Sequence, residues 1–124
     1  MDCIFCKIVN GEIPSKKLYE DDKVIVFMDV NPNVDGHSLI VPKKHYTDFT
    51  ELDDDIILHM EKVKREIGKM LMEKLNVKAL TMSMNYGESQ VVKHVHLHLL
   101  PNFITKLKPE RTVDEVYEIL KVEN

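Results

Sequence analysis

Hydrophobic and polar positions along the chain follow two periods, one typical of β-strands and one typical of an α-helix. Short β-branched or alternating runs bounded by turn residues predict strands at residues 17–20, 23–28, 37–41 and 79–84. Residues 53–75 place Ile, Met, Val and Leu side chains at helical spacing, with Glu and Lys elsewhere, and predict one long helix. The pattern therefore indicates a mixed fold in which strands come before and after that helix.

A fifth strand is predicted at residues 93–101, which read Lys-His-Val-His-Leu-His-Leu-Leu-Pro. Side chains of a strand alternate between its two faces. We therefore expect the apolar residues of this run to face the core and three histidines to share the opposite face, namely His94, His96 and His98.

Thr112 and Glu115 form a capping-box pattern that predicts a short C-terminal helix. Together these elements predict an α+β fold: an antiparallel meander of about five strands with one long helix and a short C-terminal helix. At 124 residues the chain is long enough for one hydrophobic core, so we expect a single domain over residues 1–124.

The charge pattern argues against two classes of partner. The chain has 17 basic and 21 acidic residues and a net charge of −4, and the two signs alternate along most of its length. This favours neither nucleic acid nor an anionic membrane as a partner. Apolar runs do not approach the roughly 20 residues of a membrane span, and the first residues lack a signal-peptide layout, so we expect a cytoplasmic protein.

Three histidines on one strand face are compatible with three kinds of chemistry: a zinc centre, nucleophilic catalysis by a neutral imidazole, or a merely solvated polar face. Strand interiors more readily take β-branched residues, which disfavours the last. Cys3 and Cys6 are too close in sequence to staple the fold, so they indicate either metal ligands or free thiols. A closed tetrahedral site would need two further ligands, which histidines would have to supply.

Four blocks of the sequence resemble the histidine triad (HIT) superfamily, and more narrowly its Hint-like nucleoside phosphoramidase branch. They are residues 4–14 (IFCKIVNGEIP), 26–32 (VFMDVNP), 36–45 (GHSLIVPKKH) and 94–100 (HVHLHLL). The resemblance covers nearly everything up to Pro101. It implies a half-barrel, a half-open antiparallel sheet with a long helix, in agreement with the pattern above.

The resemblance also implies a nucleotide hydrolase of the purine nucleoside phosphoramidase or dinucleoside polyphosphate hydrolase type. His96 would be the nucleophile that attacks the α-phosphorus and forms a covalent nucleotidyl-histidine. His98 would bond the phosphoryl oxygens or help to protonate the leaving group, and His37 would support the orientation and charge of the nucleophile.

Nucleotide contacts are implied by the same resemblance. Asp29 would accept hydrogen bonds from the ribose hydroxyls, and His98 would contact the phosphate. Asn85 and Gln90 would add donors to a phosphate-binding loop. The apolar walls around a purine, in an AMP or GMP derivative, would be Phe5, Ile8, Phe27 and Val30.

For the metal, the resemblance implies structural zinc held by Cys3, Cys6, His45 and His94, with no catalytic metal required. Zinc would tie the N-terminus to the histidine strand and leave His96 and His98 free, and its loss would then destabilise the fold more than it alters the chemistry. The resemblance further implies a homodimer. His59, inside the long helix, has no counterpart and is expected at the surface.

Some positions depart from the family pattern. Ser89 stands where the family usually has glycine in a longer loop, Val91 replaces a Ser or Thr that often contacts phosphate, and the segment after Pro101 lacks the common endings. Two alternatives therefore remain open: a non-catalytic nucleotide-binding scaffold, and a zinc hydrolase with all three histidines as ligands. A nucleotidyltransferase is disfavoured because such relatives typically have glutamine where this chain has His98.

Overall fold

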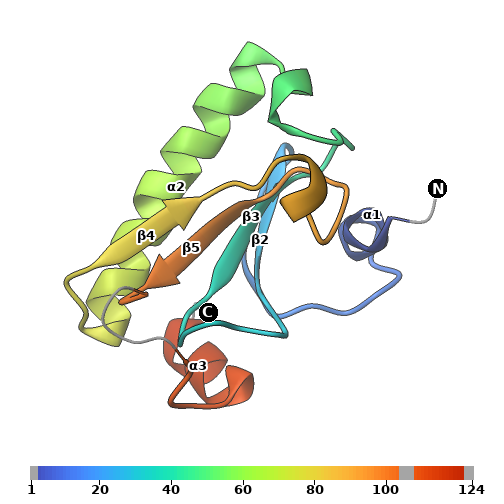
Figure 1. The fold of residues 1–124 in the computed structure, drawn as a ribbon. Helices are drawn as coiled ribbons and strands as arrows, with labels where there is room; N and C mark the ends of the chain where they lie inside the picture. Colours follow the sequence, from blue (N-terminus) through green and yellow to red (C-terminus); the bar gives the residue numbers. More distant parts are fainter. Residues whose placement is uncertain (1–2, 104–107, 122–124) are drawn as a thin grey trace.

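The structure is a computed structural model that describes residues 3–103 and 108–121. Its elements run in the order α1 (Ile4–Val9), β1 (Lys17–Glu20), β2 (Val24–Met28), β3 (Ser38–Pro42), the short 3-10 helix η1 (Phe49–Glu51), α2 (Asp54–Leu75), β4 (Leu80–Ser83), the 3-10 helix η2 (Gly87–Ser89), β5 (Leu97–Pro101) and α3 (Val113–Leu120). Figure 1 shows the long helix α2 beside the sheet and α1 on its other side.

The strands form one open antiparallel sheet, which confirms the predicted α+β class with five strands, one long helix and a short C-terminal helix. The predicted meander order is wrong, because the strands lie in the order β1-β2-β3-β5-β4. β5 pairs with β3 on one side and β4 on the other. The histidine-bearing strand is therefore an interior strand, and β4 is an edge.

Both faces of the central strands are covered. Alternate residues of β2, Val24, Val26 and Met28, pack with the apolar stripe of α2. Ile25 and Phe27 pack on the other face with Phe5 of α1. Burial on both faces explains why β2 is continuously apolar instead of alternating with polar residues.

Gly36 determines how closely the chain approaches the core just before His37. Its φ is +84°, a left-handed conformation that glycine adopts without steric cost. A Cβ at this position would lie 2.6 Å from Leu75 Cδ1 and 3.1 Å from Pro101 Cγ. The turn into β3 therefore requires glycine for its backbone angle, and a larger residue would also displace the Leu75 side chain.

Two further features differ from the sequence-based prediction. Helix α1 was not predicted, because six residues are too few to show a helical period. The predicted strand at residues 93–101 begins only at Leu97, so His94 and His96 precede it on irregular backbone. Within β5 the expected alternation holds: Leu97 and Leu99 join the core on the α2 face, and His98 pairs with Leu39 of the opposite face.

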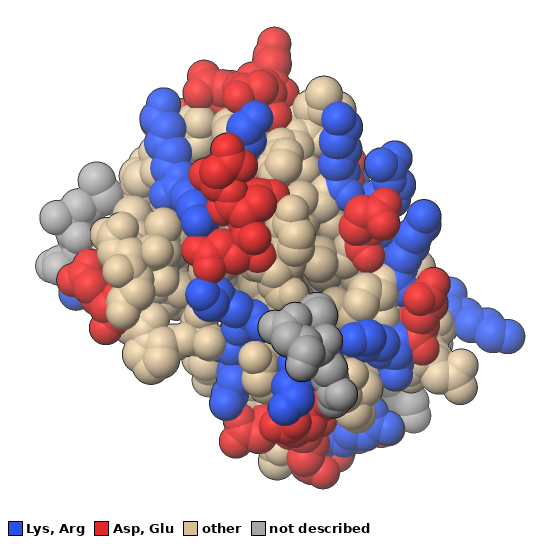
Figure 2. Space-filling model, turned by 180° about the vertical axis from the view of Figure 1, so that it is seen from behind, with Lys and Arg blue, Asp and Glu red and all other residues tan. Residues whose placement is uncertain are grey.

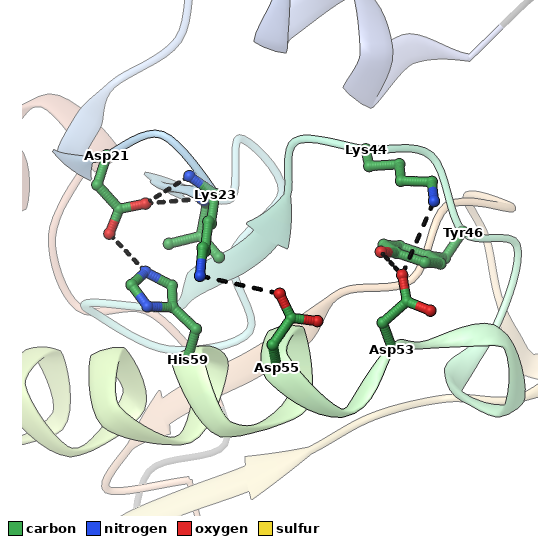
Figure 3. Close-up of polar contacts among 8 residues, drawn as sticks. Asp21, Lys23, Lys44, Tyr46, Asp53, Asp55 and His59 are labelled. Atoms are coloured by element: carbon green, nitrogen blue, oxygen red, sulfur yellow. Dashed lines mark hydrogen bonds and ion pairs between the residues drawn. The ribbon is translucent and has the colours of Figure 1, made fainter.

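Polar side chains attach the first turns of α2 to two loops (Figure 3). Asp53, the residue before α2, accepts a hydrogen bond from the Tyr46 hydroxyl at 2.9 Å and lies 3.8 Å from Lys44 Nζ. His59 Nε2 lies 2.7 Å from Asp21 Oδ2 in the β1–β2 turn. His59, which was expected at the surface, is half-buried: its side chain is 26% exposed and joins α2 to that turn.

Burial of Asp21 opposes its ionisation, but hydrogen bonds from the Tyr19 hydroxyl, the backbone N–H groups of Val24 and Lys23, and His59 outweigh it. They hold the pKa of this carboxyl well below its usual range. The carboxylate therefore stabilises the fold above about pH 4, the pKa of an unfolded Asp, and the stabilisation decreases as the pH falls below that value.

Charged side chains of both signs are interspersed on the face shown in Figure 2, with no large area of a single sign. Among the helices of the described ranges, none combines the length and apolar composition required to cross a bilayer.

We expect Asp21→Ala to lower the free energy of unfolding by about 2 kcal/mol, because it removes several hydrogen bonds to a charged acceptor. Urea denaturation at pH 7 measures this. Asp22→Ala, at the exposed neighbouring position, is the control and should change the stability by less than about 0.5 kcal/mol. Equal effects of the two substitutions would contradict the role assigned to Asp21.

Candidate active site and metal cluster

His96 is buried just before β5, and its ring orientation is set by the backbone. Its Nδ1 lies 2.7 Å from the His94 carbonyl oxygen. A carbonyl can only accept, so Nδ1 carries the hydrogen and donates it, which leaves a lone pair on Nε2. Burial lowers the pKa of His96, against the opposing effect of the His94 carbonyl. The ring is therefore held neutral in the tautomer that a nucleophile at Nε2 requires.

A second chain of hydrogen bonds fixes the protons of His37 and His98. The backbone N–H of Asn33 donates to His37 Nδ1 at 3.1 Å. His37 must then carry its hydrogen on Nε2, which lies 2.9 Å from His98 Nδ1. Since His98 Nδ1 accepts this hydrogen bond, the hydrogen of the neutral His98 ring must be on Nε2. The order Asn33, His37, His98 is thus a directed series of donors.

His98 Nε2 is the end of this series. It is buried, and no residue in the described part of the chain supplies it with a hydrogen-bond partner. Burial, together with the neighbouring His96 and His37, lowers the pKa of His98 to about 4, and burial also lowers that of His37. A buried donor without a partner is costly unless a ligand satisfies it, so His98 Nε2–H is a candidate contact for a bound group.

Asp29 lies beside this series. One carboxylate oxygen is 3.6 Å from His37 Nε2, and the other accepts a hydrogen bond from the backbone N–H of Asn31 at 2.8 Å. Its side chain is partly exposed. The structure thus brings Asp29, His37, His96 and His98 to one place, as the sequence analysis expected, with ring centroids of His96 and His98 4.8 Å apart.

Three of the four predicted apolar wall residues belong to one cluster on the α1 side of the sheet. Phe5 packs edge-on against Phe27 at 5.4 Å and against His96 at 4.9 Å, and Ile8 packs against the same cluster. Val30 differs, because its side chain is 74% exposed on the turn after β2.

The two polar residues of the predicted phosphate loop differ in their surroundings. Gln90 is buried, and its amide braces the loop by accepting from Gly87 N–H at 3.1 Å and donating to the Thr47 carbonyl at 2.7 Å. Asn85, at the start of the loop, is half-buried. Val91 is almost fully exposed. The side chain of Gln90 therefore already has protein partners for both of its amide atoms.

The predicted metal ligands form a second cluster. The Sγ or ring-nitrogen atoms of Cys3, Cys6, His45 and His94 all lie within 4.8 Å of one another. His94 Nδ1 is 3.3 Å from Cys3 Sγ and 3.5 Å from Cys6 Sγ, and His45 Nδ1 is 3.3 Å from Cys6 Sγ. Two thiols and two imidazoles at this spacing fit a closed tetrahedral zinc site.

Proton positions support this fit. His94 Nε2 lies 2.8 Å from the Pro42 carbonyl, so it donates its hydrogen there and leaves the Nδ1 lone pair facing the sulfurs. Burial, followed by the neighbouring Cys3, raises the pKa of Cys6 to about 11. A bound cation would favour the thiolate and offset that cost.

Asp29, His37 and His98 also offer atoms within 4.8 Å of one another, yet they are a poor metal site. The Asn33 N–H occupies the lone pair of His37 Nδ1, which keeps the hydrogen on Nε2, the atom that would have to bind the ion. Sequence reasoning missed Asn33 and Pro42, because both act through backbone atoms and their side chains carry no signal.

Comparison with known proteins gives a consistent result. The HIT domain family model matches residues 10–105. An uncharacterized HIT-like protein of Methanocaldococcus jannaschii is 42% identical over 96% of each chain. An Arabidopsis thaliana protein named adenylylsulfatase HINT3 is 37% identical over 81% of this chain and 52% of its own. A crystal structure of a Zn-bound histidine triad family protein from Mycobacterium smegmatis is 31% identical, has a TM-score of 0.88, and covers 98% of this chain and 91% of its own.

The proton arrangement makes a direct prediction. At pH 7 we expect the Nδ1–H tautomer for His96 and the Nε2–H tautomer for His37, His94 and His98, because each has one nitrogen committed by the bonds above. Long-range ¹H–¹⁵N correlation spectra distinguish the tautomers. An Nε2–H tautomer at His96 would contradict the assignment of its nucleophilic atom.

The pH dependence of stability follows from the buried rings. Burial lowers the pKa of His94 and of His98 to about 4, whereas an unfolded histidine protonates near pH 6.5. Between these values the unfolded chain binds more protons, so the free energy of unfolding should decrease as the pH falls from about 6.5 towards 4. Denaturation across this range measures the slope, and a constant free energy would contradict neutral burial of these rings.

Proposed function

This chain belongs to the HIT family, and from that premise we propose that it is a nucleotide hydrolase that acts through a covalent nucleotidyl-histidine on His96. The observation that supports the proposal is a pair of buried histidines. In the described part of the chain, the Nε2 lone pair of the neutral His96 ring has no hydrogen-bond donor, and the Nε2–H of His98 has no acceptor. One supplies a nucleophile and the other a hydrogen bond for a phosphoryl or leaving-group oxygen or nitrogen.

The reaction would proceed in two displacements. In the first, the lone pair of His96 Nε2 forms a bond to the α-phosphorus, and the bond to the leaving group breaks with its electron pair going to that group, which takes up a proton from solvent as it departs. The His94 carbonyl bonds Nδ1–H and so supports the positive charge that develops on the ring. In the second, water attacks the phosphorus, the P–N bond breaks with its electrons returning to Nε2, and the proton of water passes to solvent.

Asp29 is proposed to hold the ribose hydroxyls, and the apolar cluster around Phe5 and Phe27 to hold a purine base. The support for this placement is proximity: Phe5 touches His96, and Asp29 lies beside His37. A relative is named for action on an adenylyl compound, which agrees with a nucleotide substrate. Val30 and Gln90 are weaker candidates, given the exposure of the first and the existing hydrogen bonds of the second.

Of the alternatives, a zinc hydrolase centred on three histidines fits the geometry poorly. His94 directs Nδ1 to the cysteine sulfurs and Nε2 to the Pro42 carbonyl, whereas His96 uses Nδ1 to bond the His94 backbone. The three rings therefore have separate partners. A non-catalytic nucleotide-binding scaffold is the remaining alternative. The adduct experiment described next distinguishes it from the hydrolase.

We expect wild-type protein incubated with adenosine 5′-phosphoramidate and quenched early to carry acid-labile AMP on His96, detected by mass spectrometry. His96→Ala should lose the adduct and lower turnover by about 10³-fold or more, because it removes the nucleophile. The matched control is His59→Gln, which removes a histidine outside the site and should retain the adduct. A scaffold would bind the nucleotide without forming an adduct, and full turnover by His96→Ala would refute the mechanism.

We also propose that the Cys3, Cys6, His45 and His94 cluster binds one structural zinc ion and supplies no catalytic metal. Elemental analysis should find about one zinc per chain, and Cys6→Ser together with His45→Ala should abolish it and lower the melting temperature. Asp29→Asn, in the other group of candidate ligands, is the control and should keep the zinc. Zinc retained by the double variant would contradict the ligand assignment.

A homodimer, purine preference and a cytoplasmic location remain predictions from the sequence. Sedimentation equilibrium tests the first, and a comparison of turnover between purine and pyrimidine phosphoramidates tests the second. Fractionation of the source cells tests the third.

A further inference from the structure

The proposed nucleophile His96 is connected to the Cys/His cluster by two contacts, one with the ligand His94 and one with Phe5, which lies between the ligands Cys3 and Cys6. We propose that the Cys3, Cys6, His45 and His94 cluster is the support that orients His96, acting through the His94 backbone and through the ring of Phe5, so that emptying the cluster loosens the nucleophile. The proposal rests on the proposed function for its kinetic consequence and on geometry alone for its structural one.

The first contact is through the backbone of a ligand. His94 offers Nδ1 to the cluster, fixes Nε2 on the Pro42 carbonyl, and presents its own carbonyl to His96 Nδ1 at 2.7 Å. Between these two histidines, the Val95 N–H donates to the Tyr46 carbonyl at 2.8 Å, next to the ligand His45. The segment that carries His96 is therefore attached to two of the four ligands. It is continuous in sequence with His94, and the hydrogen bond from Val95 to Tyr46 joins it to the neighbour of His45.

The second contact is through α1. A helix of six residues has little stability of its own, because nucleation is costly and so few hydrogen bonds repay it. Its N-cap is the ligand Cys3, whose sulfur accepts the Cys6 N–H at 3.2 Å. The ligands Cys3 and Cys6 thus bracket Phe5, which is 7% exposed and packs edge-on against His96 at an interplanar angle of 86°.

Together these contacts restrain the His96 ring at two places: at Nδ1, by a hydrogen bond, and at its edge, by an aromatic ring. If the cluster is emptied, the cysteines and His45 lose their common partner, and α1 is then held to the sheet by the apolar packing of Phe5, Ile8 and Val9. Phe5 can then withdraw and the imidazole can turn. Small losses of alignment at a reacting atom reduce rates by about tenfold to a hundredfold. Phe5 is accordingly a positioning residue, and metal loss should affect chemistry as well as stability.

The test compares the zinc-loaded protein with protein stripped by chelator under reducing conditions. The first measurement is the exchange of the His96 Nδ1–H proton with water, by NMR, which needs no substrate. We expect exchange about tenfold faster or more in the stripped protein, together with a loss of the single tautomer. Unchanged exchange and tautomer in a stripped, folded protein would overturn the proposal, as would a chain that takes up no zinc.

The second experiment uses the Phe5→Leu variant with zinc bound. It tests the proposal even if the stripped protein unfolds. We expect the same faster Nδ1–H exchange and about a tenfold lower single-turnover rate of adduct formation at saturating adenosine 5′-phosphoramidate. The control is Ile4→Ala, an exposed neighbour on α1, which should change neither. A Phe5→Leu variant with raised KM alone, and exchange unchanged, would make Phe5 only a wall of the base pocket and overturn its positioning role.

The two proposals fail in different ways. If zinc-loaded wild type forms no adduct while zinc still protects the His96 proton, the hydrolase assignment fails and the coupling stands. If the adduct forms equally fast with and without zinc and proton exchange is the same, the coupling fails and the hydrolase assignment stands.

Discussion

The tautomer of His96 depends on one hydrogen bond, from its Nδ1 to the His94 carbonyl. A carbonyl has no hydrogen to donate, so this contact fixes which ring nitrogen carries the proton and which offers a lone pair. The same device recurs nearby: the Pro42 carbonyl sets the tautomer of His94, and the Asn33 N–H sets that of His37. Backbone groups thus assign different roles to three chemically identical side chains.

This arrangement requires the backbone to be irregular where the histidines lie. In a regular strand the His94 carbonyl would point along the ladder towards a neighbouring strand, but here β5 begins only at Leu97, and the preceding segment bonds the loop at Tyr46. His94 faces the cysteines, and His98 lies on the sheet face opposite α2. The two clusters are therefore adjacent but use separate donor atoms.

Burial gives the site its electrostatic character. The central strands are covered on both faces, by α2 on one side and by α1 on the other, so the histidine rings lie in surroundings that disfavour charge. Their lowered pKa values keep the rings neutral, which suits both a nucleophile and a metal ligand. Gly36 forms the turn just before His37 with a φ of +84°, a conformation that other residues rarely adopt.

Local periodicity and turn chemistry are enough to predict the existence of the five strands, the long helix, the capped C-terminal helix and the grouping of histidines. They do not predict that β5 begins only at Leu97 and lies between β3 and β4, that a short helix carries Phe5 onto His96, or that Gln90 braces a loop, because these features depend on contacts between distant segments. The proton positions depend on such contacts too, since they are set by backbone carbonyls and N–H groups, which nearly every residue type possesses and no side-chain pattern reveals.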